Sequence, residues 1–363
     1  MDPKKVVFTK ALLKWHKTQN FREMPWKGEK EPYRIWLSEV ILQQTRVEQG
    51  RAYYERFIHS FPTVDDLAAA PEQKVFKLWE GLGYYNRCRN LIATAQRISA
   101  EYEGRFPSSY EEILGLKGIG PYTAAAIASF AFNLPHAVVD GNVMRVLTRF
   151  FGIRTPIDTT AGKRELTAMA DSLLDPRHAA QYNQAIMDFG ATVCTPRNPH
   201  CASCPQQSGC VALQQGLTQQ LPVKEKTILK RTRYFYYFII ETPGNKVYIR
   251  QRSSKDIWEG LYEFVLHETN DPVLPGDLLN ADFARQLFDG QPLTVRHIST
   301  EYRQQLSHQT LRGQFITIRL KRPLESLKGY RLISKNTLSN YAFPKFVNTW
   351  LSDSDMAQKF IFS

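Results

Sequence analysis

The chain has 363 residues, and its 47 Lys and Arg against 35 Asp and Glu give a formal charge of +12. This length predicts two domains joined by a linker, and the charge is equally compatible with a polyanionic partner and with a basic protein that has none. No run of about 18 apolar residues and no apolar signal segment occurs. We therefore expect a cytoplasmic protein and no membrane partner.

Apolar residues between Phe8 and about Leu213 recur mostly at the spacing of amphipathic helices. Prolines such as Pro32 and Pro121 stand at the starts of these stretches. The first part of the chain is therefore predicted to be all-α, with helices over residues 33–49, 63–69, 73–78, 87–102, 122–132, 143–151, 163–174 and 179–192.

Glu39 lies within the first of these helices, on the same face as Trp36 and Leu42. A carboxyl group on such a face is partly desolvated, which favours its neutral form and raises its pKa. It would then suit the role of a proton donor near neutral pH. The alternative is a buried glutamate paired with an arginine such as Arg34 or Arg46.

A glycine hairpin, Lys117-Gly118-Ile119-Gly120-Pro121, leads directly into the helix over 122–132. Its two glycines let the backbone approach a ligand, and the following helix N-terminus offers unpaired N–H groups to a phosphate. The hairpin thus indicates a DNA contact, although a plain connection between two helices would also favour these glycines.

Asp140 precedes Gly141-Asn142 and the predicted helix over 143–151. Aspartate at this position is an ordinary N-cap. A capping role alone is one interpretation. The other is that the N–H donors keep the carboxylate ionised, as a partner for developing positive charge.

Four of the five cysteines follow the pattern Cys194-x6-Cys201-x2-Cys204-x5-Cys210. In a reducing compartment such clustering indicates a metal site rather than disulfides. Four thiolates satisfy either an iron–sulfur cluster or a tetrahedral zinc ion. Zinc sites usually present two separated C-x2-C pairs, and this pattern contains one.

The pattern changes after a polar and basic stretch over 214–232, which is predicted to be a linker. Aromatic and β-branched runs then predict strands over 234–241, 247–252, 262–266 and 315–320, with helices over 277–288 and 344–351. The predicted domains are therefore 1–213 and 233–363, the second of class α+β.

The cysteine run 194–210 resembles the [4Fe-4S] loop of the endonuclease III and adenine glycosylase family of base-excision enzymes. That resemblance implies a structural cluster that shapes a DNA-contacting loop, with Arg197 and His200 as phosphate contacts. It also implies a multi-domain protein: a helix-hairpin-helix glycosylase domain with the [4Fe-4S] loop, followed by a Nudix-like domain.

Residues 8–213 resemble the helix-hairpin-helix glycosylases closely. The members that also cleave the DNA backbone carry a Schiff-base lysine where this chain has Tyr122. A phenol cannot attack the sugar as an amine does, so the resemblance implies a monofunctional glycosylase. Lys117, Gly118 and Gly120 of the hairpin are implied as DNA contacts.

The segments Ser38-Glu39-Val40-Ile41-Leu42-Gln43-Gln44-Thr45 and Val139-Asp140-Gly141-Asn142-Val143 resemble the catalytic segments of adenine glycosylases. This implies Glu39 as the acid that protonates adenine, Asp140 as the carboxylate that stabilises the sugar cation, and Tyr122 and Asn142 as their support.

Four further residues are implied as contacts to the DNA or to the base. The resemblance implies that Gln44 and Tyr84 intercalate beside the lesion. Tyr84 lies in a glycine-framed loop, which can push an aromatic ring into a duplex. Core packing is the alternative for this tyrosine. Gln184 stands where some members carry a Glu that contacts adenine, and Lys27 stands where others have Arg.

The second domain resembles the Nudix-like domain of adenine glycosylases, but it lacks the glutamate-rich helix with which Nudix hydrolases bind metal. Hydrolysis there is therefore not expected. Leu306-Ser307-His308 resembles the family's Phe-Ser-His loop, with Leu in place of Phe. This implies that Ser307 and His308 recognise 8-oxoguanine.

The predicted function is excision of adenine mispaired with 8-oxoguanine or guanine, by a monomer acting on double-stranded DNA of the nucleoid. Two alternatives stay open. One is a glycosylase of the same fold for another mismatched base, such as thymine opposite guanine; the other is a catalytically silent DNA-damage-binding protein.

Overall fold

The computed structural model describes residues 3–225, 230–253 and 255–353. Contacts within the chain divide it into two compact units: unit 1 is Met1–Ala70 with Arg89–Thr227, and unit 2 is Pro71–Cys88 with Ile228–Ser363. The predicted boundaries differ, because residues 71–88 group with the C-terminal half. Residues 226–229 of the predicted linker and 354–363 of the second domain lie outside the described residues.

Unit 1 is helical, as the sequence predicts. Three of its helices, over residues 3–18, 110–114 and 211–214, were not predicted, and the helix over 47–60 lies mostly outside the predicted ranges; the others match predicted helices in position. The described helices that lie wholly or mostly in this unit are α1 (Pro3–Thr18), α2 (Pro32–Leu42), α3 (Val47–Ser60), α4 (Val64–Ala69), α6 (Asn86–Glu101), α7 (Tyr110–Leu114), α8 (Pro121–Phe132), α9 (Gly141–Phe151), α10 (Thr160–Leu173), α11 (Ala179–Thr192) and α12 (Val211–Gln214).

The helix predicted over 33–49 is wrong, because the structure breaks it into α2 and α3. Gln44 has a φ of 56°, in the left-handed region that a continuing helix cannot adopt, and Thr45 N donates to Leu42 O in a tight turn. The break has a consequence for function, because it turns the side chains of residues 43–45 toward a cavity instead of along a helix face.

Local sequence signals set the start of each helix that carries a candidate site residue. Gly120 is the N-cap of α8 and Pro121 its first residue, while Asp140 caps α9. Helix α7, the turn over 115–120 and α8 together form the predicted helix-hairpin-helix.

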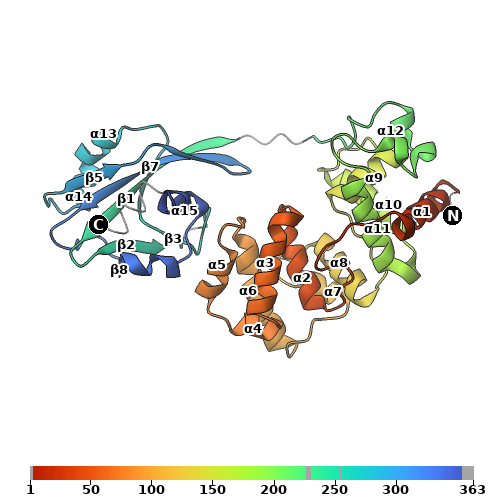
Figure 1. Cartoon of the computed structure of the whole chain (residues 1–363), viewed down its shortest axis with the longest axis horizontal. Helices are drawn as coiled ribbons and strands as arrows, with labels where there is room; N and C mark the ends of the chain where they lie inside the picture. The colour runs from red at the N-terminus through yellow and green to blue at the C-terminus, as the bar shows by residue number, and fades with distance from the viewer. Residues whose placement is uncertain (1–2, 226–229, 254, 354–363) are drawn as a thin grey trace. The chain divides into compact units, whose positions relative to one another are not determined.

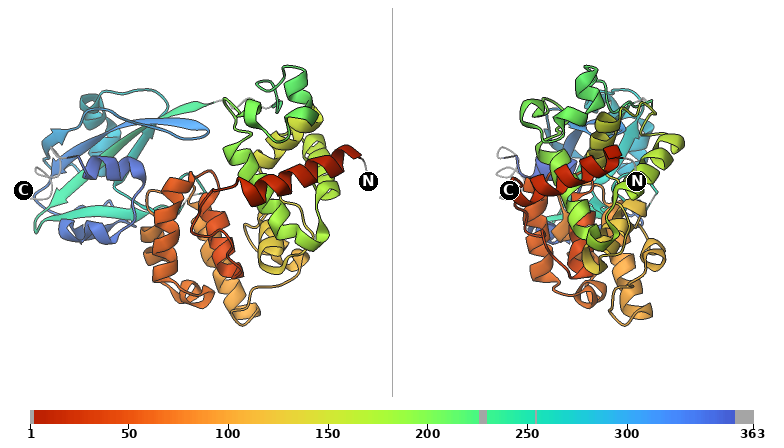
Figure 2. Two further views of the ribbon diagram at one scale, coloured as in Figure 1. Left: turned by 45° about the vertical axis from the view of Figure 1, so that its right-hand side comes forward. Right: turned by 90° about the vertical axis from the view of Figure 1, so that its right-hand side faces the viewer.

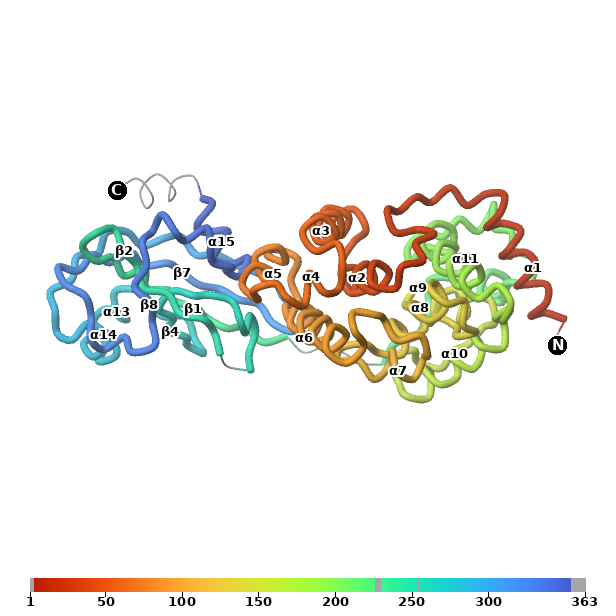
Figure 3. Tube along the Cα trace, turned by 90° about the horizontal axis from the view of Figure 1, so that it is seen from below, coloured from red at the N-terminus to blue at the C-terminus, as the bar shows by residue number. Residues whose placement is uncertain are grey.

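Helices α1, α9, α10 and α11 share a hydrophobic core that includes Phe8, Trp15, Leu147 and Phe189. Figure 2 shows α1, in red, crossing the helices of this group. Helix α2 packs against α3 and α8 (Figure 3). These contacts bring the middle of α2 opposite the starts of α8 and α9.

Unit 2 contains a mixed sheet, drawn in Figure 1. Its central pair is β1 with β7, which run parallel in register from Arg231 opposite Gln309 to Glu241 opposite Arg319. The strands found among the described residues are β1 (Arg231–Thr242), β2 (Lys246–Gln251), β3 (Tyr262–Glu263), β4 (Val265–Thr269), β5 (Thr294–Ile298), β6 (Tyr302–Gln305), β7 (Gln309–Arg319) and β8 (Arg331–Ser334).

The helix predicted over 277–288 is two short helices, α13 (Pro275–Asn280) and α14 (Asp282–Leu287). Ala281 separates them because its extended backbone, with ψ of 157°, ends one helix and begins the next. The last described helix of the sheet domain is α15 (Lys345–Leu351), close to its predicted range.

Helix α5 (Glu72–Trp79) belongs to unit 2 because its side chains hold the backbone of residues 340–343. Gln73 donates to Asn340 O at 2.8 Å and Lys77 Nζ to Tyr341 O at 3.1 Å. Glu80, just after the helix, accepts from Phe343 N at 2.8 Å. These pairings are 263 or more residues apart in sequence, so helix periodicity carries no sign of them.

Across residues 3–225, 230–253 and 255–353, no helix combines the length and the hydropathy that crossing a membrane requires.

Candidate active site

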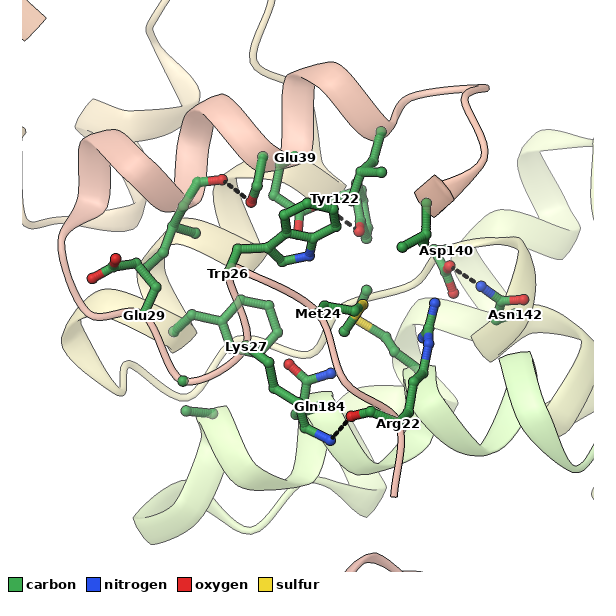
Figure 4. Close-up of a pocket in the computed structure, with 18 of the residues that line it drawn as sticks. Arg22, Met24, Trp26, Lys27, Glu29, Glu39, Tyr122, Asp140, Asn142 and Gln184 are labelled. Carbon is green, nitrogen blue, oxygen red and sulfur yellow. Dashed lines mark hydrogen bonds between the residues drawn. The ribbon is translucent and has the colours of Figure 1, made fainter. Parts of the chain in front are cut away.

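A cavity of about 830 Å³ lies in unit 1, between the loop that precedes α2, the α2 helix, and the starts of α8, α9 and α11. Figure 4 shows it with 18 of its lining residues as sticks. Seven residues predicted from sequence line it together: Lys27, Glu39, Gln44, Tyr122, Asp140, Asn142 and Gln184. Such a volume accommodates one nucleobase with its sugar.

Glu39 is the buried acid of this cavity, and the residue is 7% exposed. Burial raises the pKa of Glu39 to about 7, and the nearby negative charge of Asp140 acts in the same direction. The Tyr122 hydroxyl donates to Glu39 Oε2 at 2.6 Å and opposes the rise. The predicted desolvation is confirmed, and Arg34 pairs with Glu29 rather than with Glu39.

Asp140 caps α9 and is held by two donors. Its Oδ1 accepts from Val143 N at 2.8 Å, and its Oδ2 accepts from the Asn142 side-chain amide at 2.7 Å. The expectation that these donors set its protonation needs correction. Burial is the larger effect and raises the pKa of Asp140, while the donors and the charge of Arg145 lower it.

Tyr122 stands on the first turn of α8, and burial raises the pKa of its phenol well above the ordinary value. The hydroxyl therefore stays protonated and serves as a donor to Glu39. Asn142 is oriented in turn by Arg145, whose Nη2 donates to Asn142 Oδ1 at 2.8 Å and to Gly190 O at 2.7 Å.

Sequence reasoning missed Arg145 and Gly190. Arg145 is buried, and it follows Asp140 by little more than one turn of α9, which is a usable signal in the sequence. Gly190 is required because a Cβ there would lie 2.7 Å from Asn142 Cβ and 2.9 Å from Asn142 O. The absence of a side chain lets α11 pack directly on the turn that holds Asp140.

Lys27 and Gln184 also line the cavity (Figure 4). Lys27 Nζ donates to Arg22 O at 2.6 Å and lies 3.2 Å from Asp188 Oδ2, so its charge is partly satisfied within the protein. Gln44 lines the same cavity from the turn between α2 and α3. The roles predicted for these three residues stay predictions.

The hairpin residues Lys117, Gly118 and Gly120 are exposed and lie outside the cavity lining. Gly118 has a φ of 77°, and a Cβ there would meet Asn90 at 2.6 Å, so the fold itself requires this glycine. A Cβ on Gly120 would meet nothing within 4 Å. The fold therefore leaves Gly120 open to close approach from outside.

In unit 2, Ser307 and His308 form the turn between β6 and β7, which Leu306 N closes by donating to Gln309 O at 2.8 Å. The Tyr84 hydroxyl and Ser307 Oγ share a hydrogen bond. Tyr84 is 44% exposed with a φ of 50°, so the alternative of core packing does not apply to it.

The four clustered cysteines line one small cavity in unit 1 together with Arg149, whose Nη1 lies 3.5 Å from Cys194 Sγ. Among the described residues, which include these four cysteines, no three His, Cys, Asp or Glu side chains are arranged to hold a metal ion. The fifth cysteine, Cys88, is buried elsewhere.

Comparison with known proteins identifies the chain's two parts. A model described as "HhH-GPD superfamily base excision DNA repair protein" matches residues 37–170, and a NUDIX domain model matches residues 236–353. An adenine DNA glycosylase of Buchnera aphidicola subsp. Baizongia pistaciae is 35% identical over 308 residues, which cover 84% of each chain. The chain belongs to the adenine DNA glycosylase family.

Other members and neighbours agree with this placement. The adenine DNA glycosylase of Homo sapiens is 42% identical over 223 residues, covering 59% of this chain and 41% of that protein. The solved structure of a thermostable thymine-DNA glycosylase is 30% identical with a TM-score of 0.54, covering 58% of this chain and 97% of that one. This adenine glycosylase family member is an enzyme, a DNA glycosylase, and the predicted order of a helical domain followed by a Nudix-like domain is confirmed.

Proposed function

We propose that this enzyme removes adenine mispaired with 8-oxoguanine or guanine from double-stranded DNA, acting as a monomer and without cutting the backbone. Its setting would be base excision repair at nucleoid DNA. The observation that carries the proposal is a carboxylic acid, Glu39, with a pKa near 7, facing a second carboxylate, Asp140, across one cavity large enough for a flipped nucleotide.

In the proposed reaction Glu39 transfers its proton to a ring nitrogen of the extruded adenine. The C1′–N bond then breaks, and its electron pair leaves with the base. A pKa near neutrality supports this role, because it keeps a useful fraction of Glu39 protonated at working pH.

Asp140 would stabilise the positive charge that develops on the sugar; water would then add at C1′ and give up its proton to the Glu39 carboxylate. Its N–H donors and the dipole of α9 favour the ionised form against the effect of burial. By the sequence resemblance Tyr122 stands where the strand-cleaving members carry a Schiff-base lysine, and its phenol stays protonated. Both points support base removal without strand cleavage.

DNA would be held through the hairpin, where the first turn of α8 offers free N–H groups and Gly120 permits close approach of a phosphate. Lys117 would add a phosphate contact, and Gly118 is needed for the shape of the turn. Gln44 and Tyr84 are the proposed intercalating residues, each in a left-handed turn conformation that sets its side chain apart from the helices beside it.

The opposite base would be recognised at the β6–β7 turn. Ser307 offers a hydroxyl and His308 an imidazole to the edge of 8-oxoguanine, where N7–H and O8 distinguish it from guanine. The hydrogen bond between Tyr84 and Ser307 supports this assignment, because it joins an exposed aromatic residue to the turn within one unit.

Cys194, Cys201, Cys204 and Cys210 are the proposed ligands of a [4Fe-4S] cluster, which would hold the loop 194–210 in shape. The small cavity that all four thiols line supports one shared site. Their spacing contains a single C-x2-C pair, which favours a cluster over zinc. A brown protein that absorbs at about 400 nm is expected; a colourless protein with stoichiometric zinc would contradict this assignment.

The deciding experiment incubates the protein with duplexes that carry A:8-oxoguanine, A:G, T:G or A:T, and then treats each with alkali. Cleavage of the A:8-oxoguanine strand only after alkali is the expected result. Absence of cleavage at adenine would refute the proposal, and cleavage without alkali would refute monofunctionality. Preference for T:G would favour the thymine alternative, which the 30% identity to a thymine-DNA glycosylase keeps in consideration.

A further inference from the structure

The wall of the cavity that faces α11 is a loop without helix or strand, residues 19–31 between α1 and α2. Arg22, Met24, Trp26 and Lys27 of this loop all line the cavity (Figure 4). Its backbone hydrogen bonds are few, for example Lys27 N to Met24 O at 3.0 Å. An irregular segment of this kind keeps one conformation only if side chains tie it to the rest of the fold.

Asp188 on α11 supplies these ties. Its Oδ2 accepts from the Asn20 amide at 2.8 Å and lies 3.2 Å from Lys27 Nζ, while its Oδ1 accepts from Arg22 Nη1 at 2.9 Å. Lys27 Nζ then donates to Arg22 O at 2.6 Å, which closes the loop on itself. Three residues of one loop thus meet on a single carboxylate.

The burial of this group shows where it can act. The side chain of Asp188 is fully buried, whereas those of Arg22 and Lys27 are 23% and 26% exposed. Asp188 is also not among the residues that line the cavity, so it does not touch a bound base. Burying a carboxylate costs free energy, and nearby cations and hydrogen-bond donors offset that cost.

We infer that Asp188 is a positioning residue, which holds Arg22 and Lys27 in the wall of the base pocket and so keeps the pocket shaped for the flipped adenine. The inference rests on the proposed function for the identity of the base, and on the contacts above for the anchor itself. Neither the predicted site residues nor the catalytic carboxylates include Asp188.

The substitution Asp188→Asn tests the inference. Asparagine keeps the size and one acceptor, but it cannot balance two cations and it turns an amide donor toward one of them. The loop is expected to loosen, and single-turnover excision at A:8-oxoguanine is expected to slow by about ten- to a hundredfold, as misplacement of a wall by about 1 Å can do. Asp188→Glu should recover part of the rate, and Asp171→Asn, an exposed carboxylate on α10, is the matched control.

If Asp188→Asn alters only the base pocket, binding to a duplex that offers no base to this pocket should not change. Affinity for a duplex with a tetrahydrofuran abasic analogue should therefore stay within about threefold of wild type, while the enzyme concentration that gives half the maximal excision rate rises. Lys27→Gln should reduce the effect of Asp188→Asn, because the two residues act together. The inference would be overturned if affinity for the abasic duplex fell as much as excision at A:8-oxoguanine. It would also be overturned if the effects of Asp188→Asn and Lys27→Gln on the excision rate simply added in the double variant.

Limited digestion with trypsin reports on the anchor without any catalysis. Cleavage after Arg22 and Lys27 should accelerate in Asp188→Asn, while cleavage at other sites stays unchanged; unaltered cleavage at both positions would overturn the inference. If Asp188→Asn does not fold, faster cleavage after Arg22 in Lys27→Gln supports the anchor, and an unchanged rate refutes it. If the wild-type enzyme removes no adenine, the proposed function fails and the digestion still decides the anchor.

Discussion

Replacing Glu39 by glutamine removes the proton that the proposed reaction needs and keeps the shape of the side chain. The amide oxygen of the substituted side chain can still accept the hydrogen bond that Tyr122 donates. Because general acid catalysis typically contributes about 10²- to 10⁴-fold, single-turnover excision should fall by at least that factor. Binding to a duplex with a tetrahydrofuran abasic analogue should stay unchanged.

The same substitution should change stability in a pH-dependent way. The pKa of Glu39 is about 7 in the folded protein against an ordinary value of 4.5, so the folded state binds the proton more tightly than the unfolded chain does. This contribution to stability is fully present below pH 4.5 and is lost as the pH rises through about 7. At about 1.4 kcal/mol for each tenfold change in proton affinity, the loss is about 3 kcal/mol.

Glutamine carries no charge at any pH, so Glu39→Gln should gain stability relative to wild type as the pH rises. Between about pH 5.5 and about pH 8.5 the gain should be about 2 kcal/mol, or a relative rise of about 4 to 8 °C in the thermal midpoint of a unit of about 200 residues. Glu165→Gln, on the exposed face of α10, is the control and should show no such trend.

Thermal unfolding of the three proteins at both pH values measures this directly. Any cost of burying the glutamine amide is the same at both pH values, so only the difference between them is used. A stability difference that does not change with pH would show that Glu39 is not desolvated and would contradict its role as the acid. Activity of Glu39→Gln within about tenfold of wild type would refute that role outright.

Three further results are expected. In Tyr122→Phe the alkaline limb of the excision rate should move to higher pH, because the hydrogen bond that is lost lowers the pKa of Glu39 in the wild-type enzyme; a move to lower pH contradicts this. Asp140→Asn keeps an N-cap acceptor for Val143 N but loses the negative charge, so single-turnover excision should fall by about 10²- to 10³-fold. Ser307→Ala combined with His308→Ala should reduce the preference for A:8-oxoguanine over A:G by about 1 to 3 kcal/mol, measured as a ratio of rates; an unchanged ratio would remove the β6–β7 turn from recognition.

The candidate site places its acid and its carboxylate in contrasting surroundings. Glu39 lies in the middle of a helix, where one phenol is its hydrogen-bond partner, whereas Asp140 lies at a helix N-terminus with two donors and a nearby arginine. Burial acts on both groups in the same direction. The hydrogen-bond donors around Asp140 favour its ionised form and so distinguish its proposed role from that of Glu39. Arg145 supports this by orienting Asn142, one of those donors.

The bounds of most helices and the positions of the catalytic candidates followed from sequence, because caps, hairpin glycines and apolar spacing act within about one or two turns of chain. The break after α2 did not follow, since Gln44 takes its left-handed conformation inside a stretch with unbroken helical spacing. Similarly, no local pattern places residues 71–88 in the same unit as the sheet.

What only the tertiary structure decided is how groups far apart in sequence meet. The contact from Tyr122 to Glu39 spans 83 residues, and those from Asp188 to Arg22 and Asn20 span 166 and 168. The direction of the Asp140 pKa also depends on burial by neighbouring helices, which outweighs the cap that the sequence correctly predicts. Residue types and spacing therefore determined which candidate groups this chain carries. Packing determined the protonation, partners and anchoring of those groups, because desolvation and long-range contacts exist only in the folded chain.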